Sequence, residues 1–334
     1  MDAASAPPSQ SGGRQPLPPP SPPNGDASTR PPRSVLSYLR YSAIAPGLIP
    51  SGIIVAIVIA LVFASKLTLL HNFFGFNWNP TLSWGIGAFV AGSFLTAIPA
   101  LAFSMLIGLG LAVASTTYLP RLVASLLDPF VDLLAGIPSV IYGIWGFIVI
   151  GPYFGMTINP WLADHLRLIP WFGPPSGNTL GEGLPLAIFL LTLMALPITT
   201  LLIRDSLRAV PRDLWESGLA LGATRWEVLR RVALPYARRG VMSAAFLGFG
   251  RAFGETVAVA MVFGSTAVIP SNFYGTGYTL AAAMFELVDS SYGNFQFLAV
   301  LTEMALVLLA ISLAVNIIGR RLVIRLSTTE VAGV

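Results

Sequence analysis

An arginine and a glutamate lie four residues apart inside a long apolar run of this sequence. Arg251 falls within the apolar residues 240–264, where a centred arginine costs roughly 2.5–3.5 kcal/mol even on a mild insertion scale. Glu255 follows four positions later, so a helix would place its carboxylate within reach of the guanidinium. Two interpretations follow. The residues form an ion pair that only joins helices, or Arg251 binds an oxyanion in transit while Glu255 holds and releases the guanidinium.

Other kinds of site find little support in the residue types. Cysteine is absent from the sequence, which excludes disulfides and thiolate metal sites. His71 and His165 are predicted to lie in loops without the spacing of metal ligands, so we expect no metal site. The single lysine, Lys66, follows Ser65, and the G-x-x-x-x-G-K pattern of a nucleotide-binding loop is missing. We therefore expect no catalytic residue and no cofactor in this chain.

Two further acidic residues make weaker candidates for a site within the membrane. Glu303 falls in the last apolar run, near its predicted outer end. Asp132 falls near the predicted inner end of the third run. Because an ionisable group near a helix end can reach the membrane surface, neither position requires a functional role.

The segment between Pro211 and Pro235 predicts a pair of short helices. Pro211 suits the first turn of a helix, and Gly222 is a natural C-terminal stop. Thr224 and Glu227 have the spacing of a capping box, so a second helix is predicted to begin there and to end at Pro235. Two short helices rarely hold together alone in water. This pair needs a partner surface, which is either another protein or the membrane face.

Apolar runs dominate the composition. Hydrophobic residues make up 54% of the 334 residues and charged residues only 10%, far below the roughly 25% of a soluble domain. A hydrocarbon core about 30 Å thick requires roughly 20 apolar residues per helix. We therefore predict an all-α membrane protein with six transmembrane helices, and we expect a kink or tilt in the second, which contains Pro99. The six runs cover about residues 43–65, 86–114, 131–151, 183–203, 240–264 and 297–319.

The distribution of arginines predicts which loops are cytoplasmic. Sixteen of the 19 lysines and arginines fall before the first run, in 115–130, in 204–239 or after the last run. The remaining loops carry only Lys66 and Arg167. By the positive-inside rule, both termini and the 204–239 loop are cytoplasmic. The net charge of +4 therefore indicates topology and not a nucleic-acid partner. The outward loops are then 66–85, 152–182 and 265–296.

Composition also divides the chain into segments. Residues 1–33 are rich in Pro, Ser and Gly and predict a disordered cytoplasmic tail, with a ligand for an SH3-like domain as the alternative. Residues 34–326 form the predicted transmembrane domain, which includes the cytoplasmic loop 205–239. Residues 327–334 form a second cytoplasmic tail.

Two of the outward loops carry further signals. The Pro- and Trp-containing segment 152–182 is predicted to be irregular, with a docking surface for an external partner as the alternative. The segment 265–296 is predicted to contain a Gly-rich turn and a short helix capped by Thr279. This segment is interpreted either as a gate or as a plain loop.

The spacing within the cytoplasmic loop resembles a family signature. Glu216-Ser217-Gly218, then Gly222, nine residues and Val232-Ala233-Leu234-Pro235 resemble the E-A-A, three residues, G, nine residues, I-x-L-P signature of ABC importer permeases. The resemblance implies a fold like that of type I ABC importer permeases. It also implies a cytoplasmic coupling helix pair that docks on an ATPase. The implied coupling residues are Glu216, Gly218, Gly222, Ala223, Leu234 and Pro235.

Two further stretches resemble the phosphate-specific transport permeases. Gly248–Val259 is similar to their arginine, glycine, glutamate, threonine motif, and Ile137–Gly146 resembles the PstC-type subunit more than the PstA-type. The likeness covers about residues 35–326, and the long Pro-rich tail departs from it. It implies phosphate import by alternating access across a bacterial plasma membrane, with Arg251, Glu255 and Thr256 on the substrate path.

The same resemblance implies a set of partners. They are a PstA-like second permease subunit, a dimer of a PstB-like ATPase that holds ATP and Mg, and an external PstS-like phosphate-binding protein. Three other functions stay open. They are import of another oxyanion such as sulfate or molybdate, a secondary anion transporter, and a scaffold that also reports external phosphate to the cell.

Overall fold

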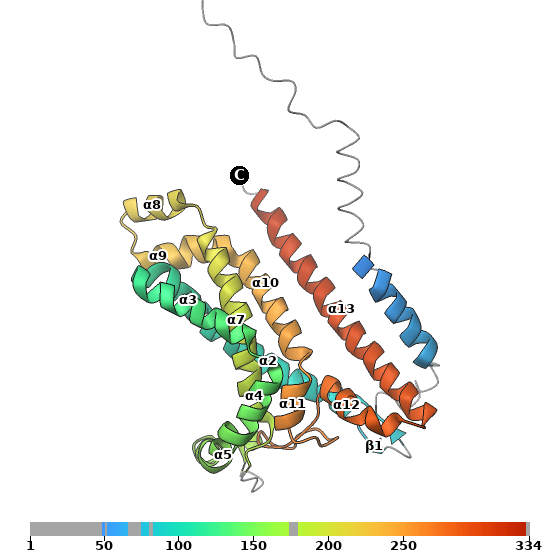
Figure 1. Ribbon diagram of the computed structural model, residues 1–334. Coiled ribbons are helices and arrows are strands. Elements are labelled where there is room, and N and C mark those ends of the chain that lie inside the picture. Colours follow the sequence, from blue (N-terminus) through green and yellow to red (C-terminus); the bar gives the residue numbers. More distant parts are fainter. Residues whose placement is uncertain (1–48, 51, 66–74, 80–82, 174–179, 332–334) are drawn as a thin grey trace, which may run out of the picture. The chain divides into compact units, whose positions relative to one another are not determined.

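The computed structural model describes residues 49–50, 52–65, 75–79, 83–173 and 180–331 (Figure 1). The chain divides into two compact units, Met1–Ala56 and Ile57–Val334. An apolar helix over Gly52–Ser65 is the described part of the first predicted span. The predicted tail 1–33 and His71 lie outside the described residues. The elements that follow belong to the second unit.

Four helices in the described part of the chain are long and apolar enough to cross a membrane. Helix α2 (Gly87–Val113) contains Pro99 and continues through a π-helical turn to Tyr118. Helices α7 (Leu184–Arg208) and α13 (Phe295–Val331) match the fourth and sixth predicted spans. The fourth long helix, Ser139–His165, departs from its prediction.

The prediction of a third span over 131–151 was wrong in its boundaries. Helix α3 (Arg121–Gly136) ends at Ile137, whose extended backbone precedes Pro138. A residue before proline is pushed out of the helical region, and hydropathy alone does not detect such a break. The next helix starts at Ser139 and continues to His165, so much of 152–182 is helical and not irregular.

The helix Ser139–His165 contains two prolines in its interior. Its α-helical parts are α4 (Ser139–Trp145), α5 (Gly151–Tyr153) and α6 (Asn159–His165), which are joined by two π-helical turns. Pro152 and Pro160 each stand in the first turn after a π-helical turn. A π turn shifts the hydrogen-bond pattern by one residue, so the ladder can restart at the proline.

The predicted fifth span, 240–264, is also interrupted. Helix α10 (Leu234–Phe253) ends before Gly254, and helix α11 (Val257–Val262) follows after a gap of three residues. The shorter elements are α8 (Arg212–Ala220), α9 (Arg225–Val228), α12 (Leu280–Leu287), the 3₁₀ turns Pro170–Phe172 and Asp289–Ser291, and a hairpin of β1 (Trp78–Asn79) and β2 (Ser83–Trp84).

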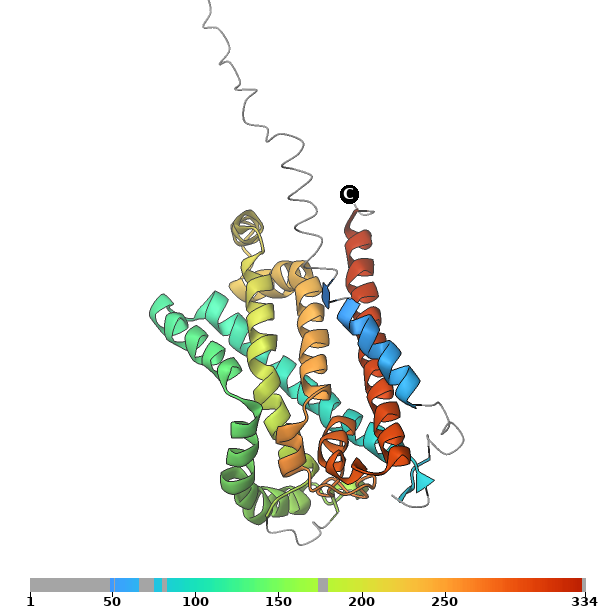
Figure 2. The same cartoon turned by 45° about the vertical axis from the view of Figure 1, so that its right-hand side comes forward.

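Within the second unit, the two predicted kinds of loop lie at opposite ends of the long helices. Helices α8 and α9 and the C-terminal end of α13 lie at one end, whereas α11 and α12 lie at the other (Figures 1 and 2). Helix α12 begins as predicted, because the Thr279 hydroxyl accepts a hydrogen bond from the Ala282 N–H at 3.2 Å.

Helix α7 is the central helix of the unit. Its most apolar 18-residue stretch is 72% buried, against 28–33% for the same stretch of the other three long helices. Those three helices therefore keep one face for lipid or another subunit. Thr199 of α7 donates a hydrogen bond to the Ser104 carbonyl of α2 at 3.2 Å. Gly108 of α2 and Gly248 of α10 both face Thr199, where an added Cβ would meet its side chain. Small residues thus let three helices approach closely.

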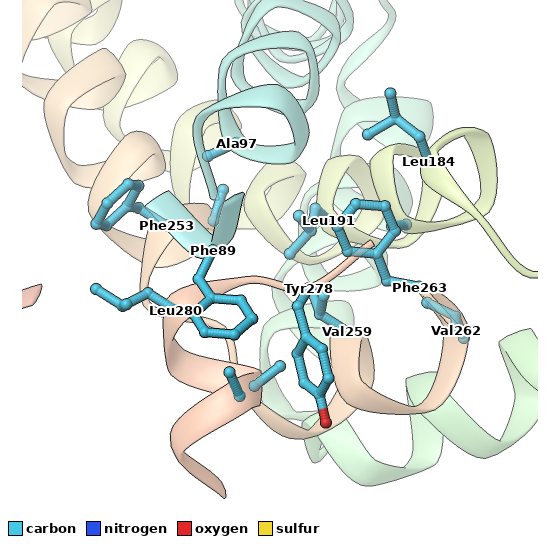
Figure 3. Packing of buried hydrophobic residues seen from close by; sticks show 14 of the residues in the cluster. Phe89, Ala97, Leu184, Leu191, Phe253, Val259, Val262, Phe263, Tyr278 and Leu280 are labelled. Carbon is cyan, nitrogen blue, oxygen red and sulfur yellow. The ribbon is translucent and has the colours of Figure 1, made fainter. Parts of the chain in front are cut away.

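The core continues toward the end that carries α11 and α12. Phe89 of α2 packs edge-on against Tyr278 with ring centroids 5.7 Å apart, and Leu280 and Phe263 lie beside them (Figure 3). The Ser93 hydroxyl accepts a hydrogen bond from the Leu280 N–H at 2.9 Å. This core fixes α11, and therefore the break that precedes it, against α2 and α7.

The close approach at Thr199 makes a testable prediction. In Gly248→Ala the new Cβ would lie 2.6 Å from Thr199 Cγ2, whereas in Gly250→Ala it meets no atom within 4 Å. We expect Gly248→Ala to destabilise the protein by about 1–3 kcal/mol through overpacking. Gly250→Ala should be neutral or slightly stabilising. Thermal unfolding of both purified variants in detergent measures the difference, and equal melting temperatures would contradict the packing described here.

Candidate functional site

Arg251 and Glu255 meet where α10 ends. Arg251 Nη1 lies 3.3 Å from Glu255 Oε2. Glu255 itself stands in the break between Phe253 and Val257. Its side chain is 5% exposed, whereas that of Arg251 is 45% exposed. The carboxylate is therefore held inside the chain, and the guanidinium keeps N–H donors available at the surface of this subunit.

Thr256, the third predicted path residue, serves the helix break. Its hydroxyl donates to the Gly254 carbonyl at 3.3 Å, and the Gly254 N–H donates to the Gly250 carbonyl at 3.1 Å. Within the described residues, no hydrogen bond joins Thr256 to Arg251. The structure thus brings Arg251 and Glu255 into contact. Thr256 follows Glu255 in the chain but has no such bond to Arg251.

A small pocket lies at the Arg251 side chain. It has a volume of about 160 Å³, and Arg251 is the one charged residue in its lining. A cationic group in an otherwise apolar pocket attracts an anion more strongly than it would in water, because the local dielectric constant is low. The lining residues are Leu134, Ala135, Ile137, Tyr142, Met194, Ile198 and Arg251.

The far wall of this pocket is the second helix break. The Tyr142 hydroxyl of α4 donates to the Leu134 carbonyl of α3 at 2.9 Å, which bridges the extended residue Ile137. Gly143 allows α4 to lie against α11, since an added Cβ would meet Met261 and Ala258. Sequence reasoning missed Tyr142 and the break. The Gly136-Ile137-Pro138 triplet was the available signal.

The predicted helix pair of the cytoplasmic loop is present as α8 and α9. Helix α8 ends in a Schellman motif, in which the Gly222 N–H bonds the Leu219 carbonyl at 2.9 Å and the Ala223 N–H bonds the Gly218 carbonyl at 3.3 Å. Gly222 has a φ of +84°, a conformation that favours glycine. Gly218 faces Val228 of α9, where an added Cβ would lie 2.8 Å from Val228 Cγ2. These two glycines shape the turn.

The predicted capping box is confirmed at the start of α9. The Thr224 hydroxyl accepts from the Glu227 N–H at 3.3 Å, and the Thr224 N–H donates to the Glu227 carboxylate at 2.9 Å. These hydrogen bonds, first that of the backbone N–H and then that of the hydroxyl, hold the pKa of Glu227 below its ordinary value.

The prediction that Pro235 ends the second helix was wrong. After Val228 the backbone forms a π-helical turn over Leu229–Ala233 and then continues into α10. The Leu234 N–H bonds the Leu229 carbonyl five residues back. The wider turn accommodates the proline ring and its missing N–H. Leu234 and Pro235 therefore lie in one continuous path from the α8–α9 pair into the broken helix that carries Arg251.

The α8–α9 pair carries exposed apolar residues and an exposed acid. Glu216 is exposed on α8, and Leu221, at the tip of the turn, is 89% exposed. Exposed large apolar side chains that surround a charge are typical of a surface that another protein covers. The exposed apolar residues are Leu214, Leu219, Leu221 and Trp226.

An ion-pair network that sequence reasoning missed joins α3 to α7. Arg204 Nη1 lies 3.0 Å from Asp128 Oδ1, and Arg208 Nη2 lies 2.6 Å from Asp128 Oδ2. Asp132, a marginal candidate from sequence, lies 3.4 Å from Arg204 Nη2. The Arg204 side chain is 5% exposed, so these carboxylates compensate its burial.

Two other predictions from sequence have different outcomes. Glu303 is buried within α13, and its Oε1 atom has no hydrogen-bond partner among the described residues. The position of Glu303 near the outer end of the last span stays a prediction. His165 is the last residue of α6 and not part of a loop, and its Nδ1 lies 2.9 Å from the Trp161 carbonyl oxygen.

Comparison with known proteins decides the family. Residues 104–328 match the family described as "Binding-protein-dependent transport system inner membrane component". The chain belongs to this family. The four long apolar helices within the described residues are in keeping with an inner membrane component. The matched range includes the α8–α9 pair, both helix breaks and the Arg251–Glu255 contact.

Individual members of the family are similar over most of the chain. The phosphate transport system permease protein PstC of Xylella fastidiosa is 36% identical over 271 residues, which cover 80% of this chain and 82% of that protein. PstC 1 of Mycobacterium tuberculosis is 36% identical over 296 residues, with 81% and 87% covered. A bacterial alginate ABC transporter, solved with an alginate pentasaccharide-bound periplasmic protein, shares the fold. The TM-score is 0.57 at 17% identity, with 86% of this chain and 95% of that chain covered.

The capping box predicts how the start of α9 responds to pH. The pKa of Glu227 is lower in the folded protein than its ordinary value of 4.5. The ionised carboxylate therefore stabilises the start of α9 fully above pH 4.5, and this stabilisation is lost as the pH falls through the folded-state pKa. Amide exchange at Thr224, corrected for intrinsic rates, should therefore accelerate only once the pH falls below the ordinary pKa of a glutamate. In Glu227→Gln this acceleration should disappear. The same acceleration in Glu227→Gln would contradict the assignment.

Proposed function

We propose that this chain is a permease subunit of an ATP-driven importer that carries inorganic phosphate across the bacterial plasma membrane. The observation that carries the proposal is the half-exposed Arg251, held by the buried Glu255 at a break in α10–α11. The choice of phosphate as substrate rests on relatives that are named phosphate transport permeases and are 36% identical to this chain over most of their length. A guanidinium recognises phosphate through paired N–H donors, which fits that substrate.

The proposed path runs past the two helix breaks. Broken helices at membrane depth are tolerated where their free backbone groups line a cavity or are buried in protein. Here they bring Arg251 and the Tyr142–Leu134 bridge around one small pocket, and Glu255 contacts Arg251 from the break after α10. An anion that binds Arg251 competes with Glu255 for the guanidinium. Glu255 can then hold the guanidinium again after the anion has left.

The proposed topology has six spans with both termini in the cytoplasm. Arg-rich loops support this orientation, and in the second unit the α8–α9 pair lies at the same end as the C-terminal end of α13. The transmembrane domain is 34–326, between a cytoplasmic tail over 1–33 and another over 327–334. The coupling loop is 205–239.

The proposed partners follow from the exposed α8–α9 surface and from the family. A PstB-like ATPase dimer docks on α8 through Glu216, Gly222 and neighbouring residues, and it holds the ATP and Mg. ATP-driven closure moves the α8–α9 pair. The continuous helix from Arg225 through Pro235 carries this movement to the break at Glu255. A PstA-like permease completes the path, and a PstS-like protein delivers phosphate from outside.

Uptake of labelled phosphate tests the substrate. In a host without its own phosphate permeases, the assembled complex should support uptake that excess sulfate or molybdate does not reduce. Arg251→Ala should abolish uptake, and Arg251→Lys should restore only part of it because a lysine lacks the planar fork. Leu106→Ala on the exposed face of α2 is a matched lipid-side control. If sulfate or molybdate blocks the uptake, the transported substrate is that class of oxyanion and not phosphate.

Substitution of the turn glycine tests coupling. Gly222 and Gly293 share a φ of +84°, and a Cβ at either position meets no atom within 4 Å. Gly222→Ala and Gly293→Ala therefore impose the same backbone strain of roughly 1 kcal/mol at two different places. We expect Gly222→Ala and Glu216→Ala to lower phosphate uptake per ATP hydrolysed severalfold, while Gly293→Ala leaves that ratio unchanged. Equal ratios in all three variants would contradict the docking role of α8.

A further inference from the structure

A second, larger cavity lies near the α8–α9 end of the long helices, away from Arg251. It has a volume of about 740 Å³ and is formed by the end of the α2 helix, α3, the end of α7 and the start of α8. None of its lining residues belongs to the pocket around Arg251. The lining comprises three arginines, one aspartate, three hydroxyl residues and five apolar or aromatic residues. Those that carry the argument are Arg121, Asp128, Arg208, Arg212 and Trp215.

The charges of this cavity are unbalanced. Asp128 is its one acidic lining residue, and both of its oxygens already pair with arginines, one with Arg204 and one with Arg208. Arg121 and Arg212 pair with no carboxylate in the described part of the chain. The cavity lining therefore contains two guanidinium groups without a carboxylate partner among the described residues, one from α3 and one from α8. Such an arrangement suits a ligand that is itself anionic.

The cavity lies at the depth expected for the membrane surface. The apolar helices Gly87–Tyr118 and Leu184–Arg208 both end beside it, and Trp215 lines it, a residue type enriched at headgroup depth. The outer face of α3 carries an apolar stripe that begins next to Arg121. Its members, Leu122, Leu126, Phe130 and Leu133, are 65–75% exposed and lie one helical turn apart. Acyl chains can cover such a stripe while a phosphate group reaches the arginines.

We infer that the cavity between α3, α7 and α8 binds a phosphate group through Arg121 and Arg212, supplied by an anionic phospholipid or by free phosphate. The inference does not depend on phosphate being the transported substrate. The ion pairs of Asp128 with Arg204 and Arg208 hold α3 against α7, so they keep Arg121 and Arg212 facing one cavity. A ligand in this cavity would touch α8 at Arg212 and would therefore contact the element proposed to meet the ATPase.

Lipid binding by the purified complex tests the inference. Native mass spectrometry of the complex in neutral detergent should show retained phosphatidylglycerol and no retained phosphatidylcholine. Arg121→Gln with Arg212→Gln should weaken phosphatidylglycerol binding about 100-fold, since each charge-assisted contact contributes about tenfold. Arg230→Gln changes an exposed arginine outside the cavity and should leave binding unchanged. Ser125→Trp should block binding without a change in charge.

A second arm distinguishes the two sources of the phosphate group. Thermal stabilisation by inorganic phosphate is measured in Arg251→Ala, so that binding in the pocket around Arg251 does not contribute. Stabilisation that the Arg121→Gln and Arg212→Gln pair removes assigns the cavity to free phosphate, and retention of phosphatidylglycerol alone assigns it to lipid. Either result supports the site. Binding of neither ligand, or binding that survives both the double substitution and Ser125→Trp, would overturn it.

Discussion

A guanidinium within an apolar helix loses part of its water, and the chain has to compensate that loss with a charged partner. Glu255 supplies the carboxylate at 3.3 Å, and the break at Ile137–Pro138 forms part of the pocket beside the guanidinium. Because the acid is buried and the base is half exposed, the pair is not symmetric. The chain holds the carboxylate in place and leaves the guanidinium able to exchange its partner for an anion.

The rest of the fold holds the two helix breaks, Ile137–Pro138 and Gly254–Thr256, in fixed positions relative to each other. Helix α7 lies at the centre, and Gly108 and Gly248 let α2 and α10 approach its Thr199 closely. Gly143 does the same for α4 against α11. At the α8–α9 end, a continuous helical path with one π turn runs from α9 into α10. The proposed movement of the α8–α9 pair would thus pass through continuous helix from Arg225 to Phe253 before it reaches the break at Glu255.

The sequence predicted the features that depend on near neighbours. The four-residue spacing placed Arg251 against Glu255, and Gly222, Thr224 and Glu227 marked the turn and the capping box. Two prolines show where such reasoning fails. Pro138 breaks its helix and Pro235 does not, because a π turn before Pro235 widens the backbone. The ion pair Asp128–Arg208 joins residues 80 positions apart, and the wall of the pocket around Arg251 comes from helices other than α10. Both features depend on the tertiary packing of α3 and α4 on α7 and α11, which local sequence patterns do not reveal.

The most direct test of anion binding at Arg251 uses the absence of native cysteines from the chain. Ala135→Cys introduces one thiol into the pocket around Arg251, and Gly110→Cys introduces one on α2, where an added Cβ meets no atom within 4 Å. The rate at which a thiol reagent modifies each variant is measured in the assembled complex with and without phosphate. We predict that phosphate slows modification at position 135, that it leaves position 110 unchanged, and that Arg251→Ala removes the protection. Modification of Ala135→Cys at the same rate with and without phosphate would contradict the account.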